Sequence, residues 1–127
     1  NSAASVTPQV DGKGYIQGVC PDGWRLPDRE CFASLSEVEM NKMRKPGSEY
    51  WLDGGGTNET QFSLVGAGFY NNATNRCENI LGNAYFMTTD VYGDTQVKCF
   101  EADCHCYRWQ EINQDKGTGF SVRCVKE

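Results

Sequence analysis

Hydrophobic positions change their spacing along the chain, and this change separates a helical stretch from a later series of strands. Cys31, Leu35 and Val38 recur at intervals of three and four residues, which places side chains on one face of a helix. Asp28, just before them, can accept hydrogen bonds from the free N–H groups of a first turn. The pattern predicts a helix from about residue 28 to residue 43.

After residue 56, short runs of aromatic and β-branched residues are separated by Asn, Gly and Asp. Such runs are typical of strands, and the residues between them are typical of turns. A shorter strand-like piece lies near the start, around Tyr15 and Ile16. The runs predicted as strands are 61–65, 84–89, 96–100, 107–112 and 120–125.

The order of these elements predicts an α+β domain on a mostly antiparallel sheet, because no repeat and no strand–helix alternation is present. A length of 127 residues suits a single domain with a real core. Residues 1–18 are polar and contain several glycines, so they are predicted to form an N-terminal tail leading into a first strand. Residues 19–127 are predicted to form the domain itself.

Seven cysteines in so short a chain indicate disulfide bonds formed in an oxidising compartment. Their odd number leaves at least one thiol free or joined to a partner. The net charge of -5, with scattered basic residues, argues against nucleic acid as a partner. No apolar run approaches the roughly 18 residues of a membrane span. We therefore expect a secreted or cell-surface protein that does not span a membrane.

Four segments, in order, resemble the Fibrobacter succinogenes major paralogous domain family. They read VCPDGWRLP at 19–27, FSLVGAGFY at 62–70, AYFMTT at 84–89 and GFSVRCVK at 119–126. Members of this family look like C-type-lectin-like folds in exported bacterial surface proteins, including adhesive and polysaccharide-associated ones. The resemblance implies a lectin-like domain with short helices packed on the sheet and long loops stapled by disulfides.

The resemblance also implies that the first and last strands pair and that a disulfide joins Cys20 to Cys124. A bridge across about a hundred residues is worth about 4 to 5 kcal/mol in the chain-entropy model. The remaining cysteines are extra to the family and are expected to staple the loops between residues 68 and 109. Their pairing stays open, and a bridge from the first of them to Cys77, Cys99 or Cys106 is credible. The extra cysteines are Cys31, Cys77, Cys99, Cys104 and Cys106.

Aromatic and amide side chains concentrate in two loops of the later half of the chain. Aromatic rings stack on sugar rings or anchor protein partners, and amides supply paired donors and acceptors. The mixture predicts that a glycan or a protein ligand binds directly to these loops. Because neighbours on a strand face opposite ways, Tyr107 or Trp109 could instead belong to the core. The predicted ligand-binding residues are Phe69, Tyr70, Asn71, Asn72, Asn75, Tyr92, Tyr107 and Trp109.

No cofactor is expected, and calcium is the alternative, because many lectin-like folds hold sugar hydroxyls through Ca²⁺. The usual Glu-Pro-Asn or Gln-Pro-Asp triplet is absent. A zinc site would use the thiols and the imidazole of His105 within 99–106. Cystine is the better interpretation, because contiguous strand residues point to opposite faces. The loose set of acidic residues that could bind calcium is Asp90, Asp94, Glu101 and Asp103.

The leading hypothesis is a non-enzymatic extracellular recognition module that mediates adhesion or carbohydrate binding on a bacterial surface. The chain has a lone histidine, no recognisable catalytic triad and no Gly-rich phosphate loop. One alternative is an assembly domain of a pilus-like appendage, in which an odd cysteine or strand pairing links subunits. The other is a thiol- or copper-dependent oxidase related to formylglycine-generating enzymes. That activity would require a thiol of low pKa or bound copper, and Cys31 in a first helical turn could have a depressed pKa.

Overall fold

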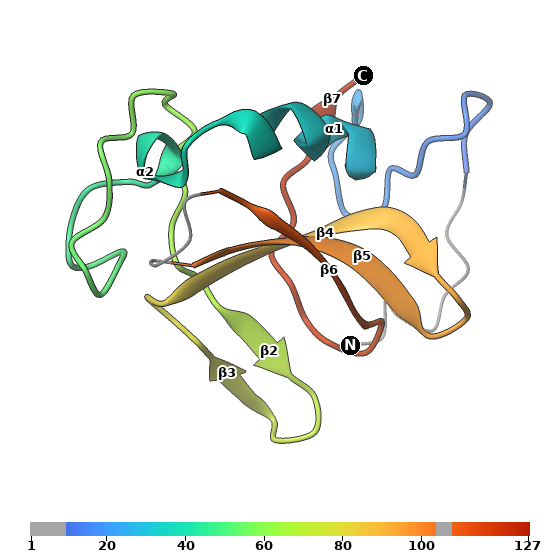
Figure 1. Ribbon diagram of the computed structural model, residues 1–127. Helices are drawn as coiled ribbons and strands as arrows, with labels where there is room; N and C mark the ends of the chain where they lie inside the picture. Colours follow the sequence, from blue (N-terminus) through green and yellow to red (C-terminus); the bar gives the residue numbers. More distant parts are fainter. Residues whose placement is uncertain (1–9, 104–107) are drawn as a thin grey trace.

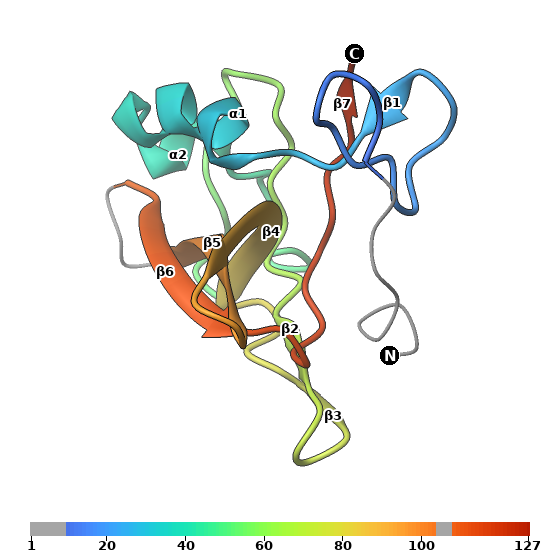
Figure 2. The same cartoon turned by 90° about the vertical axis from the view of Figure 1, so that its right-hand side faces the viewer.

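The computed structural model describes residues 10–103 and 108–127 and shows an α+β fold with mostly antiparallel strands (Figure 1). Helices lie on one side of a three-stranded sheet of order β4-β5-β6, and the β2–β3 hairpin projects from the other side (Figures 1 and 2). The strands are β1 Trp24–Arg25, β2 Phe69–Asn71, β3 Arg76–Glu78, β4 Asn83–Tyr92, β5 Gln96–Asp103, β6 Gln110–Asp115 and β7 Val125–Lys126. The helical elements are α1 Arg29–Ala33, the 3₁₀ turn η2 Ser34–Glu37 and α2 Met40–Met43.

The predicted helix begins and ends where expected but is interrupted in the middle. Asp28 caps α1, because its side chain accepts a hydrogen bond from the N–H of Cys31 at 3.2 Å. Val38 then adopts an extended conformation, with ψ of 138°. Ser36 competes with the helical backbone, since its hydroxyl donates to the carbonyl of Ala33 at 2.6 Å. Two short helices therefore replace the continuous one.

The main core lies between the helices and the sheet. Phe32 of α1 packs against Phe86 and Phe100 of the sheet, with ring centroids 5.9 and 5.3 Å apart. The break after η2 lets α2 bury Met40 and Met43 completely beside these rings. Burying each such side chain stabilises the fold by about 1.5 to 3 kcal/mol. The apolar spacing in the helical region thus reflects a real buried face.

The strand predictions are confirmed for the central hairpin and corrected elsewhere. β4 and β5 contain the predicted runs 84–89 and 96–100 and extend beyond them. The run 61–65 is not a strand: Gln61 and Ser63 have positive φ, and Leu64 makes only one isolated bridge. β6 begins later than predicted, at Gln110. The β2–β3 hairpin lies in a region predicted as a loop, and of the run 120–125 only Val125 belongs to a strand.

The ends of the domain meet, as expected from the resemblance. β1 pairs antiparallel with β7, and Cys20 is joined to Cys124 with a Cα–Cα distance of 5.8 Å. Trp24 of β1 remains 39% exposed. Within the described part of the chain, none of the helices has the length and apolar character needed to cross a membrane.

The other described cysteines are not bridged. Cys31, Cys77 and Cys99 carry free thiols, so the suggested bridges from Cys31 to Cys77 or Cys99 are wrong. Cys99 is fully buried in β5, whereas Cys77 is exposed on β3. Cys104 and Cys106 lie outside the described residues.

Candidate functional site

An open groove of about 290 Å³ lies between the turn of the β2–β3 hairpin and the segment that follows β6. The two walls are held together by backbone hydrogen bonds, because Tyr70 and Gly119 each donate to the other's carbonyl, at 2.8 and 2.9 Å. Both views show the segment after β6, in red, passing beside the hairpin (Figures 1 and 2). The groove is lined by Asn71, Asn72, Ala73, Asp115, Gly117 and Thr118.

The hairpin wall is shaped by the side chain of Asn71. Its amide donates to Glu78 across the hairpin at 2.9 Å, and its side-chain oxygen accepts from the N–H of Ala73 at 2.9 Å. These two bonds use the side chain to fix the turn. Asn71 therefore positions the turn, while its neighbour Asn72 remains exposed at the groove.

The opposite wall is a tight turn at the end of β6. The N–H of Thr118 donates to the carbonyl of Asp115 at 3.0 Å, and the N–H of Lys116 donates to the carbonyl of Thr95 at 2.9 Å. Gly119 is required next to this turn, because a Cβ there would lie 2.9 Å from the Cβ of Tyr70. This close approach keeps the two walls in contact beneath the groove.

Three polar side chains of the groove are free to bind a ligand. The amide of Asn72, the carboxylate of Asp115 and the hydroxyl of Thr118 have no hydrogen-bond partner among residues 10–103 and 108–127. Together they offer donors and strong acceptors within one small, open space. This set suits a ligand that carries several hydroxyl groups.

Two of the predicted ligand-binding residues of the hairpin line the groove. Asn71 and Asn72 line it, and Tyr70 lies next to them with its hydroxyl donating to Asn75 at 3.1 Å. Phe69 instead packs under the sheet against Tyr85 and Phe120. Its ring is a structural support for the hairpin.

The predicted ligand-binding residues of the later loop also differ in where they lie. Tyr92 is 56% exposed and pairs with Gln96, which in turn pairs with Asp115 of the groove. Residues in one such row share a face of the sheet, and two strand spacings correspond to about 10 Å. Tyr92 is therefore within reach of a ligand that extends beyond the groove.

Trp109 is not a ligand residue, and this prediction is corrected. It is 6% exposed, its ring packs edge-on against Phe62, and its indole N–H donates to the sulfur of Met43. Its large apolar surface therefore packs in the core, which is the alternative that the alternation of side chains along a strand had left open. Tyr107 lies outside the described residues.

Sequence reasoning missed Asp115 and Thr118, which it treated as part of a turn. Their local sequence is that of an ordinary polar turn, so it contains no sign of a binding role. They become a site only because the hairpin, more than forty residues earlier in the chain, lies beside them. A prediction of the Tyr70–Gly119 pairing would have been needed to find them.

The acidic residues suggested for calcium do not converge. Asp94 lies in the turn before β5 and Asp103 at the far end of that strand, whose length alone is roughly 23 Å at the usual rise per residue. Glu101 accepts a hydrogen bond from Asn83 at 2.9 Å. No cluster of three or more His, Cys, Asp or Glu side chains suited to a metal is found among the described residues. For zinc, three of the proposed ligands lie at 104–106, outside that part of the chain.

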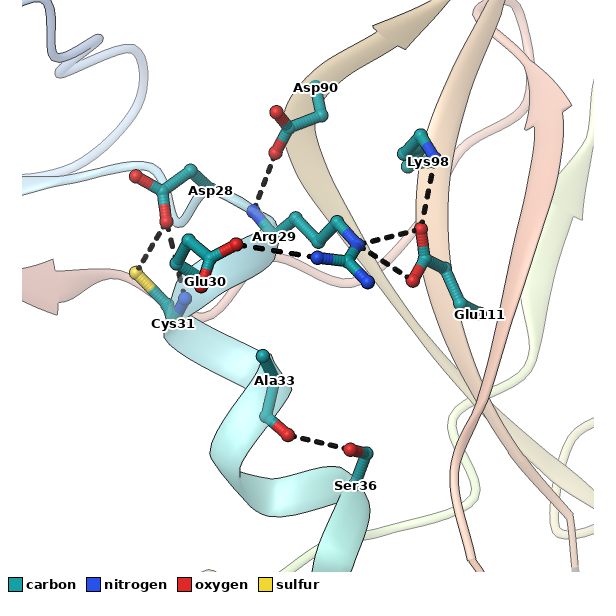
Figure 3. Close-up of polar contacts among 9 residues, drawn as sticks. All are labelled: Asp28, Arg29, Glu30, Cys31, Ala33, Ser36, Asp90, Lys98 and Glu111. Atoms are coloured by element: carbon teal, nitrogen blue, oxygen red, sulfur yellow. Dashed lines mark hydrogen bonds and ion pairs between the residues drawn. The ribbon is translucent and has the colours of Figure 1, made fainter.

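Asp90, the fourth of these acidic residues, belongs to a polar clamp that holds α1 on the sheet (Figure 3). Its carboxylate accepts from the backbone N–H of Arg29. The Arg29 side chain reaches Glu111 of β6 with its Nε 2.8 Å from the nearer oxygen, and Lys98 of β5 also donates to Glu111, at 3.1 Å. Burial raises the pKa of Glu111, but these hydrogen bonds outweigh it and keep the pKa below its ordinary value.

Burial raises the pKa of the two described thiols inside the fold, Cys31 and Cys99. Burial is the main cause that raises the pKa of Cys31, and Arg25, 3.6 Å from its sulfur, lowers it less. Burial likewise raises the pKa of Cys99 to about 12. The depressed pKa suggested for the Cys31 thiol is therefore wrong, because burial outweighs the contributions that lower its pKa.

Comparisons of the chain with protein-family profiles, with curated proteins and with solved structures find no match. Assignment to the family named above stays a prediction. The structure itself establishes an α+β fold whose ends are joined by a disulfide.

Proposed function

We propose that the chain is a non-enzymatic extracellular recognition domain of a surface or secreted bacterial protein. It binds a glycan directly, without a metal cofactor, through the groove between the β2–β3 hairpin and the end of β6. In this proposal the domain has a C-type-lectin-like fold. The disulfide between Cys20 and Cys124 supports an oxidising location such as the cell exterior.

The observation that carries the proposal is the set of free polar side chains in the groove. Asn72, Asp115 and Thr118 come from two segments and face one open space without protein partners in the described structure. A carboxylate accepts hydrogen bonds from neighbouring hydroxyls, and an amide both donates and accepts. Adjacent hydroxyl groups on a sugar ring match this combination.

The aromatic neighbours support the same ligand class. Tyr70 and Tyr92 are both partly exposed, and Tyr92 lies in the same cross-strand row as Asp115. Exposed tyrosine rings offer flat apolar faces for the C–H faces of sugars. The groove is small, close to the lower limit of about 300 Å³ for ligand pockets. It therefore suits the end or one unit of a glycan chain.

A glycan array tests this proposal. The domain should retain a restricted set of glycans in the presence of EDTA, because the binding groups are side chains rather than a metal. Asn72→Ala and Asp115→Asn should each weaken binding about tenfold or more, since each removes hydrogen bonds to the ligand. Asn113→Ala, an exposed change on the same strand as Asp115 but outside the groove, should bind like the parent protein.

Two results would count against the proposal. One is the absence of any glycan signal above that of an unrelated secreted protein at high domain concentration. The other is a glycan signal that Asn72→Ala and Asp115→Asn leave unchanged, which would move the binding surface away from the groove. Far-UV circular dichroism of each variant verifies that the hairpin and sheet are intact.

A further inference from the structure

Strand β3 presents an open sheet edge at the outer side of the hairpin (Figures 1 and 2). Tyr70 uses its backbone N–H and C=O for Gly119, so its pair with Cys77 across the hairpin is of the non-hydrogen-bonded kind. The same alternation directs the N–H and C=O of Cys77 away from β2. Within the described residues, these groups and the exposed thiol of Cys77 have no partner.

Left-handed residues on either side limit the open edge to the three residues of β3. Asn75 and Asn79 have φ values of 55° and 58°, a left-handed conformation that ends an extended strand. The edge therefore consists of Arg76, Cys77 and Glu78, and only the middle residue directs its backbone groups outward. A strand added here has a single register, centred on Cys77.

The sequence of the edge is complementary to itself. In an antiparallel pair of two β3 strands centred on Cys77, Arg76 of each copy stands opposite Glu78 of the other. Arg76 is exposed and has no ion-pair partner in the described part of the chain. Among the described residues, Glu78 accepts side-chain hydrogen bonds only from the neutral Asn71 and Thr74, and no cationic side chain there compensates its charge.

We propose that β3 pairs antiparallel with β3 of a second copy of the chain, and that a disulfide between the two Cys77 residues locks this dimer. The two-fold symmetry forms the Arg76–Glu78 pair twice. An edge this short buries far less than the roughly 1,000 Å² of a stable interface. The strand pairing sets the alignment, and the covalent bond provides the stability.

The geometry and the redox balance allow this bond. Directly opposed residues in a hydrogen-bonded antiparallel pair have Cα atoms about 5.5 Å apart, inside the usual disulfide range of about 4.4 to 6.8 Å. Each Cys77 thiol loses one proton and one electron as the S–S bond forms. A low-molecular-weight disulfide such as oxidised glutathione accepts both electrons and both protons and is reduced to two thiols.

The first experiment measures covalent dimer formed by the full chain in a buffer of oxidised and reduced glutathione, with non-reducing electrophoresis and mapping of the linked peptides. The parent protein should yield a dimer joined through Cys77. Cys77→Ser should remain monomeric, and the matched variant Cys31→Ser should form the dimer as the parent does. The proposal is overturned if a dimer persists in Cys77→Ser. It is also overturned if the parent protein stays monomeric.

A charge exchange then separates strand pairing from random collision of an exposed thiol. Arg76→Glu and Glu78→Arg each place like charges opposite one another in their own dimers, so each alone should dimerise about tenfold more slowly. A mixture of the two variants restores both opposite-charge pairs and should form mainly the mixed dimer. Equal dimer rates for all combinations would contradict the proposed register. An intact Cys20–Cys124 bridge and a parental circular dichroism spectrum verify the fold of each variant.

Discussion

Trp51 connects the loop after α2 to the core. It is fully buried, and its indole N–H donates to the carbonyl of Leu64 at 2.9 Å. The guanidinium of Arg44 lies over its ring, 4.4 Å from the centroid, and pairs with Asp53. One aromatic ring thus combines apolar burial, a hydrogen bond and a cation–π contact.

Replacing Trp51 by Phe tests this role. The change removes the indole hydrogen bond and leaves a small cavity, so the free energy of unfolding should fall by about 2 kcal/mol. Urea denaturation of the oxidised protein measures the difference. Trp24→Phe is the matched control, because Trp24 is 39% exposed and should change stability by less than about 0.5 kcal/mol. Equal effects at the two positions would contradict the structural role of Trp51.

The clamp around Arg29 operates at the scale of whole elements. It joins the start of α1 to β4 through Asp90, to β6 through Glu111, and indirectly to β5 through Lys98. Because α1 has only five residues, it cannot hold itself in place by its own hydrogen bonds. The clamp and the Phe32 contacts together keep this short helix on the sheet (Figure 3).

The pH dependence of stability tests the clamp. The pKa of Glu111 lies below its ordinary value of 4.5 in the folded protein, so its ionised form stabilises the fold. This contribution is complete above the ordinary pKa and disappears as the pH falls through the lowered one. Glu111→Gln should therefore cost about 1 kcal/mol at neutral pH, and the difference from the parent protein should shrink below about pH 4.

Unfolding measured at a series of pH values gives this difference directly. Glu49→Gln, an exposed change with no hydrogen bond in the described structure, serves as the control and should follow the parent at every pH. If the stability difference between Glu111→Gln and the parent is independent of pH, or grows under acid conditions, the ionised Glu111 carboxylate does not stabilise the fold through this clamp.

The elements that could be predicted from sequence are those fixed by neighbouring residues. The cap at Asp28 and the strands β4 and β5, with their aromatic and β-branched residues, depend on local patterns, and the structure contains them. The run 61–65 has strand-like residues, yet the left-handed conformations of Gln61 and Ser63 prevent a ladder. The groove could not be predicted, because its walls come from distant segments that meet through Tyr70 and Gly119.

At the scale of the whole molecule, the disulfide that joins the two ends of the domain stabilises the fold. β1 and β7 share only two residue pairs, so strand pairing alone contributes little there. The Cys20–Cys124 bridge closes a loop with a sequence separation of 104 residues and restricts the unfolded chain far more than a short bridge would. If β3 pairs between copies and the groove binds a glycan as proposed, the dimer has two binding sites, which raises its apparent affinity for a multivalent surface.

Removing the bridge tests the importance of this closure. The double variant Cys20→Ser with Cys124→Ser should lose about 4 to 5 kcal/mol of unfolding free energy. Guanidinium denaturation gives the value, and Cys31→Ser, which changes a free thiol, should remain close to the parent. A loss of less than about 1 kcal/mol in the double variant would show that the two terminal strands hold together without the bridge.

The most direct test of the central claim is a nuclear magnetic resonance titration of the ¹⁵N-labelled domain with a glycan that it retains on the array. If the groove binds the glycan, the largest shifts should occur at the backbone amides of 71–73 and 115–118 and at the side-chain amide of Asn72. Shifts that instead cluster on the helical side of the sheet, or a spectrum that does not change at saturating glycan, would contradict the proposed function.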